Sequence, residues 1–258
     1  MIHPDGTPGF QEDAGAKYFG LRWAGSTYLK KSLRISFRSE YGDTKLRYPL
    51  FEGYGRGVPP VEVFDQIELR TGHHDADMRG FYMSDRFTSN TMLDLGHLNP
   101  HGRYVHVYLN GVYWGLYNAV ERPDHAFSAT YFGGEKEYWD SYSNGSTTNG
   151  NTQAWNRMLS MARQGLEDDA AYQRIQGRNS DGSENPNLPQ YVDVDNIIDY
   201  MITNLYVGNT DWPHKNYWVG FNPAQPTGFK YYMWDSEWSM AVSYTHLRAH
   251  ETREDRGW

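Results

Sequence analysis

The sequence of 258 residues contains no cysteine. This absence excludes disulfide bonds, thiol catalysis and zinc sites with cysteine ligands. The sequence also lacks any run of about 20 apolar residues, the length that a membrane-spanning helix needs. No charged stretch followed by an apolar one appears at the start, so no signal peptide is visible. These absences leave the cellular compartment open.

Positive charge is scarce. The chain carries 24 Lys and Arg against 32 Asp and Glu, for a net charge of −8 at pH 7. Nucleic-acid polymers and anionic membranes bind basic surfaces, so we expect neither as a partner. Tyr and Trp are abundant, which suits amphipathic surfaces and clefts but names no ligand. The length is that of one large domain or two lobes.

The last segment needs separate treatment. VSYTHLRAHET, at 242–252, reads as the in-frame translation of a sequencing-library adapter. We therefore expect residues 241–258 to be an artefactual tail, and we expect the natural gene to continue past Met240. His246 and His250 have the i, i+4 spacing of a helical metal pair, but they fall in this tail and are discounted.

The first half of the chain predicts strands, one helix and one hairpin. Side chains alternate between apolar and polar over 31–37 and 61–70, as in half-buried strands. Apolar residues recur at helical spacing over 81–95. The clearest local signal is a hairpin over 104–120, because the Asn-Gly dipeptide at 110–111 supplies the two positive φ angles of a type I′ turn.

The second half predicts a series that ends in an acidic residue. A long helix over 194–207 is indicated by its apolar spacing, with Asp193 or Asp195 as its cap and Gly208 as its stop. The other expected elements are a short helix capped by Asp124, a mobile polar loop over 141–153, a helix over 155–162, a polar connection over 177–190 and two strands, 217–221 and 229–234.

The long helix leads into GNTDWPHKNY, in which Asn216 follows Asp211 by five residues. The kinase catalytic loop has the same D-x-x-x-x-N spacing, where the Asp accepts a hydroxyl proton and the Asn binds metal. Asp and Asn are also common in polar turns, so the spacing alone does not decide. A further acid, Asp235, comes after two short strands, as the metal-binding Asp of a kinase does. The whole order of elements is that of a kinase.

Several segments together resemble a known family. They are YGDTKLRYPLF (41–51), VYLNGVYWGLYNAVERPD (107–124), YFGG (131–134), GNTDWPHKN (208–216) and WDSEW (234–238). The set resembles the CotH family, the spore-coat-protein-H-like atypical protein kinases. The resemblance implies a two-lobed α+β fold like that of an atypical protein kinase, with its C-terminal part missing. The N-lobe-like part would cover about 9–122, and the start of the C-lobe-like part about 123–240.

The resemblance also implies roles for particular residues. Asp211 matches the catalytic Asp and Asp235 matches the metal-binding Asp of the family. The family often has W-D-x-D, whereas this chain has Glu237 at the second acid, which puts the role of that residue in doubt. We expect Asn216, Asp235 and Glu237 to hold Mg²⁺, with Glu237 as an auxiliary acid, and we expect ATP as the nucleotide.

The residues that contact the nucleotide are harder to assign, because the chain has no G-x-G-x-x-G loop. Lys31 follows a small-residue turn at 24–27 and is one candidate. Arg70 ends a strand before the helix that bears Asp85, like the Lys–Glu pair of a kinase. Glu121 lies where a kinase hinge would run. Residues such as Lys31 and Arg70 are more often ordinary surface charges than nucleotide contacts, whereas for Glu121 an adenine contact and a structural salt bridge are equally plausible.

The expected reaction is transfer of the γ-phosphoryl group of ATP to Ser or Thr of secreted or surface-coat proteins, as the resemblance implies. It also suggests an extracellular or cell-surface location. The alternative is a non-catalytic surface or adhesion protein with a kinase-like fold; the presence of Asp211, Asn216 and Asp235 favours the enzyme. The chain as written is expected to be poorly soluble and nearly inactive, because its long helix would lack partners on its apolar flank.

Two further clusters carry less weight. His73, His74, Asp75 and Asp77 could hold metal, but adjacent residues on a turn rarely converge on one ion. Tyr113, Trp114 and Tyr117 could suggest sugar binding. They lie on an alternating strand, however, so we expect core packing instead.

Overall fold

The computed structural model describes residues 1–20, 30–72 and 82–240. Three sequence interpretations fall outside these residues: the small-residue turn at 24–27, the cluster His73 to Asp77 and the tail at 241–258. No helix of the described part is long and apolar enough to cross a membrane.

The chain divides into two compact units. Unit 1 consists of Met1–His73 and Pro100–Arg122, and unit 2 of His74–Asn99 and Pro123–Trp258. Each unit has its own five-stranded sheet. The described residues thus form a mixed fold of helices and sheets, consistent with the expected α+β class.

The sheet of unit 1 is antiparallel throughout. Its strands are, in spatial order, β1 (Gly15–Phe19), β2 (Ser32–Ser36), β5 (Gln66–Arg70), β7 (Val112–Glu121) and β6 (Gly102–Leu109). The strand expected at 31–37 is confirmed as β2. The one expected at 61–70 is interrupted at Asp65, whose carboxylate binds Lys45 at 2.6 Å and whose carbonyl accepts the N–H of Phe37 at 3.0 Å. Its first part, β4 (Val63–Phe64), therefore pairs with β3 (Leu46–Arg47) and not with the main sheet.

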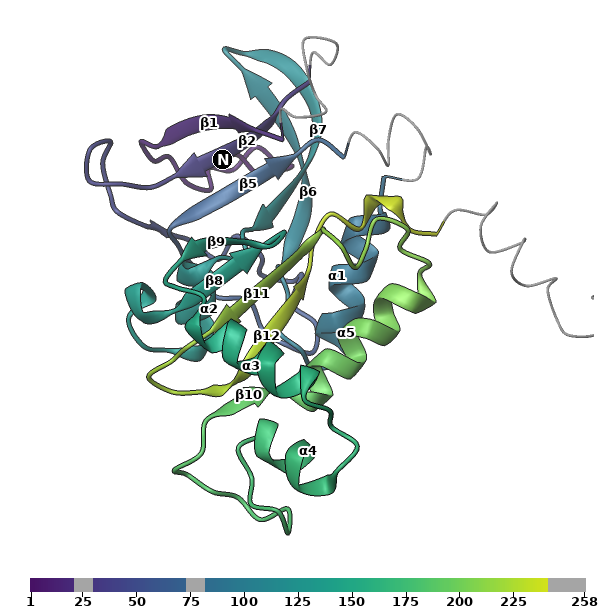
Figure 1. Ribbon diagram of the computed structural model, residues 1–258. Helices are drawn as coiled ribbons and strands as arrows, with labels where there is room; N and C mark the ends of the chain where they lie inside the picture. The colour runs from purple at the N-terminus through teal and green to yellow at the C-terminus, as the bar shows by residue number, and fades with distance from the viewer. Residues whose placement is uncertain (21–29, 73–81, 241–258) are drawn as a thin grey trace, which may run out of the picture. The chain divides into compact units, whose positions relative to one another are not determined.

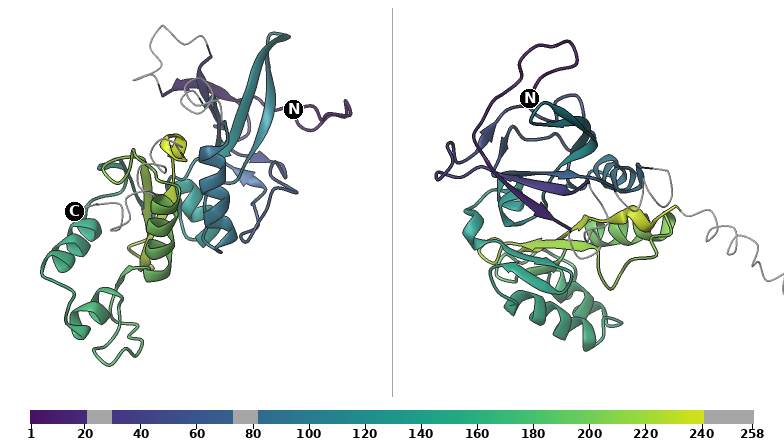
Figure 2. Two further views of the ribbon diagram at one scale, coloured as in Figure 1. Left: turned by 90° about the vertical axis from the view of Figure 1, so that its right-hand side faces the viewer. Right: turned by 90° about the horizontal axis from the view of Figure 1, so that it is seen from above.

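The hairpin of β6 and β7 is confirmed. Asn110 and Gly111 have φ angles of 50° and 79°, as a type I′ turn requires. Only the last part of β7, from Asn118 to Glu121, pairs with β5. The rest of the hairpin extends beyond its neighbouring strands, as Figures 1 and 2 show from three directions.

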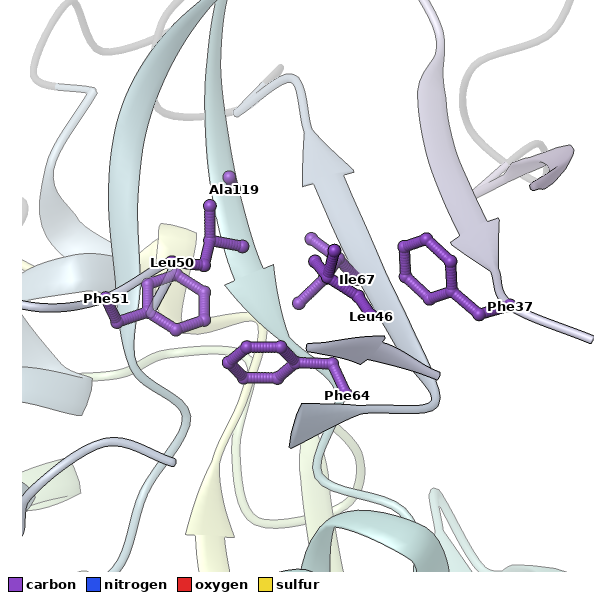
Figure 3. Packing of buried hydrophobic residues seen from close by; sticks show 7 residues of the cluster. All are labelled: Phe37, Leu46, Leu50, Phe51, Phe64, Ile67 and Ala119. Atoms are coloured by element: carbon purple, nitrogen blue, oxygen red, sulfur yellow. The ribbon is translucent and has the colours of Figure 1, made fainter. Parts of the chain in front are cut away.

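The core of unit 1 lies on one face of this sheet. Ile67 and Ala119 point toward side chains from the β3–β4 region, among them Phe51 and Phe64 (Figure 3). The rings of Phe51 and Phe64 meet edge to face, with centroids 5.5 Å apart. Burial of each such side chain contributes about 1.5–3 kcal/mol, so this cluster is a main source of stability for the unit.

Unit 2 is built around a second sheet. Its strands are, in spatial order, β10 (Gln190–Val192), β12 (Thr227–Met233), β11 (Tyr217–Phe221), β8 (Asp140–Ser143) and β9 (Ser146–Asn149). Only β10 and β12 run parallel. The helices of the described part of this unit are α1 (Ser84–Asp94), α2 (His125–Phe132), α3 (Gln153–Arg163), α4 (Asp169–Ile175) and α5 (Val194–Tyr206), with 3₁₀ helices at Lys136–Tyr138 and Ser236–Trp238.

The prediction of a mobile polar loop over 141–153 is wrong. The segment forms the β8–β9 hairpin, whose turn residues Asn144 and Gly145 have φ angles of 51° and 75°. The strands were missed because the segment is rich in Ser, Thr and Asn. Strand β8 forms by pairing with β11, which is far away in the sequence. Helix α4 and strand β10 were also not predicted, and they have only seven and three residues. The strands expected near 217–221 and 229–234 are confirmed as β11 and β12.

Helix α1 belongs with unit 2, although it follows the strands of unit 1 in the sequence. Met92, fully buried on α1, packs against Tyr200 of α5 and Met233 of β12. His97, just after α1, lies 2.8 Å from the carboxylate of Asp199. These contacts hold α1 and α5 together (Figure 1).

Helix α5 buries its polar face. Asp193 caps its start, as expected, by accepting the N–H of Asn196. Buried against the unit are Asn196, Tyr200, Thr203 and Asn204, whereas Ile198, Met201, Ile202, Leu205 and Tyr206 are exposed. The apolar stripe that predicted the helix is therefore on its solvent side, and the buried amides are available to organise the loop that follows.

Candidate active site

The candidate catalytic loop begins where α5 ends. Gly208 turns the chain with a φ of 58°, a left-handed conformation that glycine adopts readily. The N–H of Asn209 then bonds back to the carbonyl of Asn204 at 3.0 Å. The helix stop predicted at Gly208 is confirmed, and it brings the loop residues back against the last turns of α5.

Buried amide side chains tie the backbone of Asp211 to α5. The Nδ2 of Asn209 donates to the Oδ1 of Asn204 at 2.9 Å, and the Oδ1 of Asn209 accepts the N–H of Asp211 at 3.2 Å. Asn204 in turn donates to the carbonyl of Tyr200 at 2.9 Å. A chain of hydrogen bonds that starts inside the helix therefore fixes the position of the Asp211 backbone.

The carboxylate of Asp211 has three polar neighbours. Its Oδ2 accepts the Nδ2 of Asn216 at 2.8 Å, and its Oδ1 lies 2.9 Å from the Nζ of Lys215 and 4.0 Å from the Nε2 of His214. The Asp211 side chain is 24% exposed. Because a carboxylate offers about four lone-pair sites, Asp211 can still accept a proton from a substrate hydroxyl. Sequence reasoning missed Lys215, although a cation four residues after Asp211 was visible.

Asn216 lies between the two acids. Besides its bond to Asp211, its Nδ2 donates to the backbone carbonyl of Asp235 at 3.3 Å. Its backbone is left-handed, with a φ of 61°, and its N–H donates to the Oδ1 of Asn144 at 2.6 Å. The structure therefore brings Asp211, Asn216 and Asp235 together. Sequence reasoning did not name Asn144, because its segment was interpreted as a loop.

Asp235 lies two residues after the end of β12 and has a left-handed conformation, with a φ of 54°. The N–H of the next residue, Ser236, donates to the Oδ1 of Asp85 on α1 at 3.0 Å. Two residues further on, the carbonyl of Trp238 accepts the N–H of Thr210 at 3.0 Å. The segment after β12 is thus bonded both to α1 and to the candidate catalytic loop.

The residues present fit a magnesium ion that takes only a few of its ligands from the protein. The described part of the chain has no group of three or more His, Cys, Asp or Glu side chains that could hold a metal, so Glu237 forms no three-acid cluster with Asp211 and Asp235. The Nδ2 of Asn216 is directed at Asp211 and Asp235, which leaves its Oδ1 as the amide ligand atom. One carboxylate and one amide oxygen are ligands that Mg²⁺ accepts, with phosphates and water completing its shell.

Lys31 and Arg70, both in unit 1, lie at neighbouring strand ends. The hydroxyls of the adjoining residues Ser32 and Thr71 are 3.2 Å apart. Arg70 is 6% exposed and pairs in register with Asn118. The structure therefore brings the backbones of these two candidate nucleotide contacts to one end of the sheet.

Glu121 lies apart from them and forms the salt bridge that the sequence left as its alternative role. It pairs with Ile67, three residues or roughly 10 Å along the sheet from Arg70. Its Oε2 accepts the N–H of His101 at 2.8 Å and lies 2.9 Å from the Nδ1 of the same residue. The Nε2 of His101 lies 2.8 Å from the carbonyl of Val58. Since Glu121 is buried in this pairing, the geometry favours a structural role.

A buried charge cluster in unit 1 was missed by sequence reasoning. Glu68 is 1% exposed and lies 2.8 Å from the guanidinium of Arg34 and 3.5 Å from that of Arg122. Burial raises the pKa of Glu68, while Arg34, Arg122 and Arg70 act in the opposite direction. The signal was present in the strand pattern, which places Glu68 and Arg70 on one face.

The aromatic residues of the β6–β7 hairpin divide into two groups. Tyr117 is fully buried, as expected, but Tyr113 and Trp114 are 51% and 41% exposed, so the prediction that they pack in the core is wrong. The reason is the reach of the hairpin. The register of the β6–β7 pairing shifts between Val107 and Tyr108, which leaves Trp114 without a partner residue, and the part of β7 near the turn has no β5 beside it.

Fold and site together describe a mixed α/β protein with an Asp–Asn–Asp constellation at the ends of a helix and a strand. The chain matches the family model described as CotH kinase protein over residues 17–258, and it belongs to this family. The resemblance drawn from the five segments is thereby confirmed. The match includes the tail at 241–258. A search of curated proteins finds no match to the chain. Family membership indicates a kinase-like function, with ATP and a divalent metal in general.

Proposed function

We propose that this chain is an atypical protein kinase that transfers the γ-phosphoryl group of ATP to Ser or Thr of secreted or surface-coat proteins. One observation carries the proposal: the side-chain amide of Asn216 bonds both to the carboxylate of Asp211 and to the carbonyl of Asp235. Asn216 thus links the proposed base to the backbone of the proposed metal-binding residue, which supports a kinase-like site. Family membership supports the class of reaction.

In the proposed reaction, Asp211 accepts the proton of the substrate hydroxyl. The hydroxyl oxygen bonds to the γ-phosphorus, the bond to the β,γ-bridging oxygen breaks, and ADP leaves. The backbone bond to Asn209 and the side-chain bond to Asn216 hold the base in place before substrate arrives. Lys215, at 2.9 Å from Asp211, adds positive charge beside the transferred group.

Asn216 and Asp235 are the proposed ligands of Mg²⁺, which when bound supplies positive charge to the phosphate oxygens. Glu237 follows Asp235 within the 3₁₀ helix and is proposed as an auxiliary acid. In unit 1, Lys31 and Arg70 are the proposed phosphate contacts, because their backbones lie at one end of the sheet. Glu121 was the third candidate, and its bonds to His101 do not support a contact with nucleotide.

The test is transfer of radiolabel from ATP to a protein substrate by wild type and Asp211→Asn. The assay uses the purified full chain with Mg²⁺ and ATP. Loss of the base should lower turnover by about 10²–10⁴-fold. Equal transfer by the wild type and the variant would refute the role of Asp211. No transfer in the wild type, with no Mg²⁺-dependent binding of ATP, would favour the non-catalytic surface protein.

A further inference from the structure

One side chain from the β8–β9 turn reaches the candidate active site. The Oδ1 of Asn144 accepts the N–H of Asn216 at 2.6 Å. The position of Asn144 is set by the sheet, because the preceding residue Ser143 pairs with Trp218 of β11, two residues after Asn216. A contact built on paired strands is held rigidly, as a positioning contact has to be.

The backbone of Asn216 needs such a contact. Its φ of 61° is left-handed, a conformation that costs free energy for a residue with a side chain. Asn216 is 8% exposed, so its N–H would lack a partner if the acceptor were removed. Rotation to a right-handed backbone would redirect the side chain away from Asp211 and the carbonyl of Asp235. The hydrogen bond from the N–H of Asn216 to the Oδ1 of Asn144 opposes that rotation.

We propose that Asn144 is a positioning residue of the active site, whose side chain holds Asn216 in the left-handed conformation that places its amide between Asp211 and Asp235. The hold of Asn144 on the backbone of Asn216 depends on the structure alone. Its consequence for nucleotide binding rests on the proposed function.

The competing explanation is that Asn144 serves only its own turn, since Asn-Gly is favoured in any type I′ turn. The chain contains a matched turn that separates the two explanations. Asn110 and Gly111 have φ angles of 50° and 79°, against 51° and 75° for Asn144 and Gly145. Both asparagines are exposed, but Asn110 lies at the tip of the β6–β7 hairpin in unit 1, whereas Asn144 accepts the N–H of Asn216.

The experiment compares three substitutions. Asn144→Gly keeps a residue suited to positive φ but removes the acceptor; Asn144→Asp keeps an acceptor; Asn110→Gly makes the first change in the matched turn. Hydrogen–deuterium exchange reports the amide of Asn216 in each variant, and thermal melting confirms that each is folded. Loss of one buried hydrogen bond should speed this exchange by roughly tenfold in Asn144→Gly and leave it near the wild-type rate in the other two.

A second readout is the affinity of the full chain for ATP at a series of Mg²⁺ concentrations. Asn144→Gly should weaken the Mg²⁺-dependent part by roughly 5- to 10-fold, and Asn144→Asp should restore most of it. Wild-type exchange at Asn216 in Asn144→Gly would overturn the proposal. Faster exchange with unchanged Mg²⁺-dependent affinity would overturn the positioning role and leave the proposed function standing. Faster exchange with no Mg²⁺-dependent binding in the wild type would overturn the proposed function and support the hold of Asn144 on Asn216.

Discussion

Replacing Asn209 by alanine removes the side chain that joins α5 to the candidate catalytic loop. Two hydrogen bonds are lost, one of 2.9 Å to the Oδ1 of Asn204 and one of 3.2 Å from the N–H of Asp211. Asn204 is 1% exposed, so the loss of a partner for its Oδ1 should cost about 1–3 kcal/mol. The bond to Asp211 is partly exposed and should contribute about 0.5–1.5 kcal/mol. The free energy of unfolding should fall by about 1.5–4.5 kcal/mol in total.

Urea unfolding followed by tryptophan fluorescence measures this loss. Asn156→Ala, an identical change on the exposed side of α3, is the matched control and should alter stability by less than about 0.5 kcal/mol. A cycle with Asn204→Ala should give a coupling of at least about 0.5 kcal/mol, because the two side chains are bonded. If Asn209→Ala matches Asn156→Ala, or if the cycle is additive, the amide chain does not anchor Asp211.

Two further substitutions test contacts on either side of the site. Asp85→Ala should leave the N–H of the fully buried Ser236 without its acceptor, lower the unfolding free energy by about 1–3 kcal/mol and weaken Mg²⁺-dependent ATP binding through Asp235; melting and titration check both. Glu121→Ala should cost about 3–5 kcal/mol in unfolding experiments, because His101 and Glu121 are both buried, while Glu121→Gln should cost less. A large loss of ATP affinity in a well-folded Glu121→Gln would instead restore Glu121 as a nucleotide contact.

Local signals predicted the elements that local chemistry controls. The Asn-Gly turn at 110–111, the cap at Asp193 and the stop at Gly208 each act within a few residues, and each was correct. The β8–β9 hairpin was missed although Asn144-Gly145 carries the same turn signal, because its strands have no apolar alternation and depend on β11. Register across a sheet is long-range information that one strand's sequence does not contain.

In the candidate site, too, sequence reasoning found only the residues that their spacing along the chain marks. The spacing of Asp211 and Asn216, and the place of Asp235 after two strands, are serial features and were found. Asn144 bonds to Asn216 across strands, so no spacing along the chain marks it. Tyr113 and Trp114 show the converse error, since alternation predicted two faces but not how far the neighbouring strand extends.

The most direct test of the account is a calorimetric titration of ATP, with and without Mg²⁺, into wild type, Asp211→Asn and Asp235→Asn. Asp235 is the proposed metal ligand, and Asp211 is the proposed base. Asp235→Asn should therefore lose most of the gain in ATP affinity that Mg²⁺ gives the wild type, and Asp211→Asn should retain it. Equal Mg²⁺ dependence in wild type and Asp235→Asn would contradict the assignment of the site.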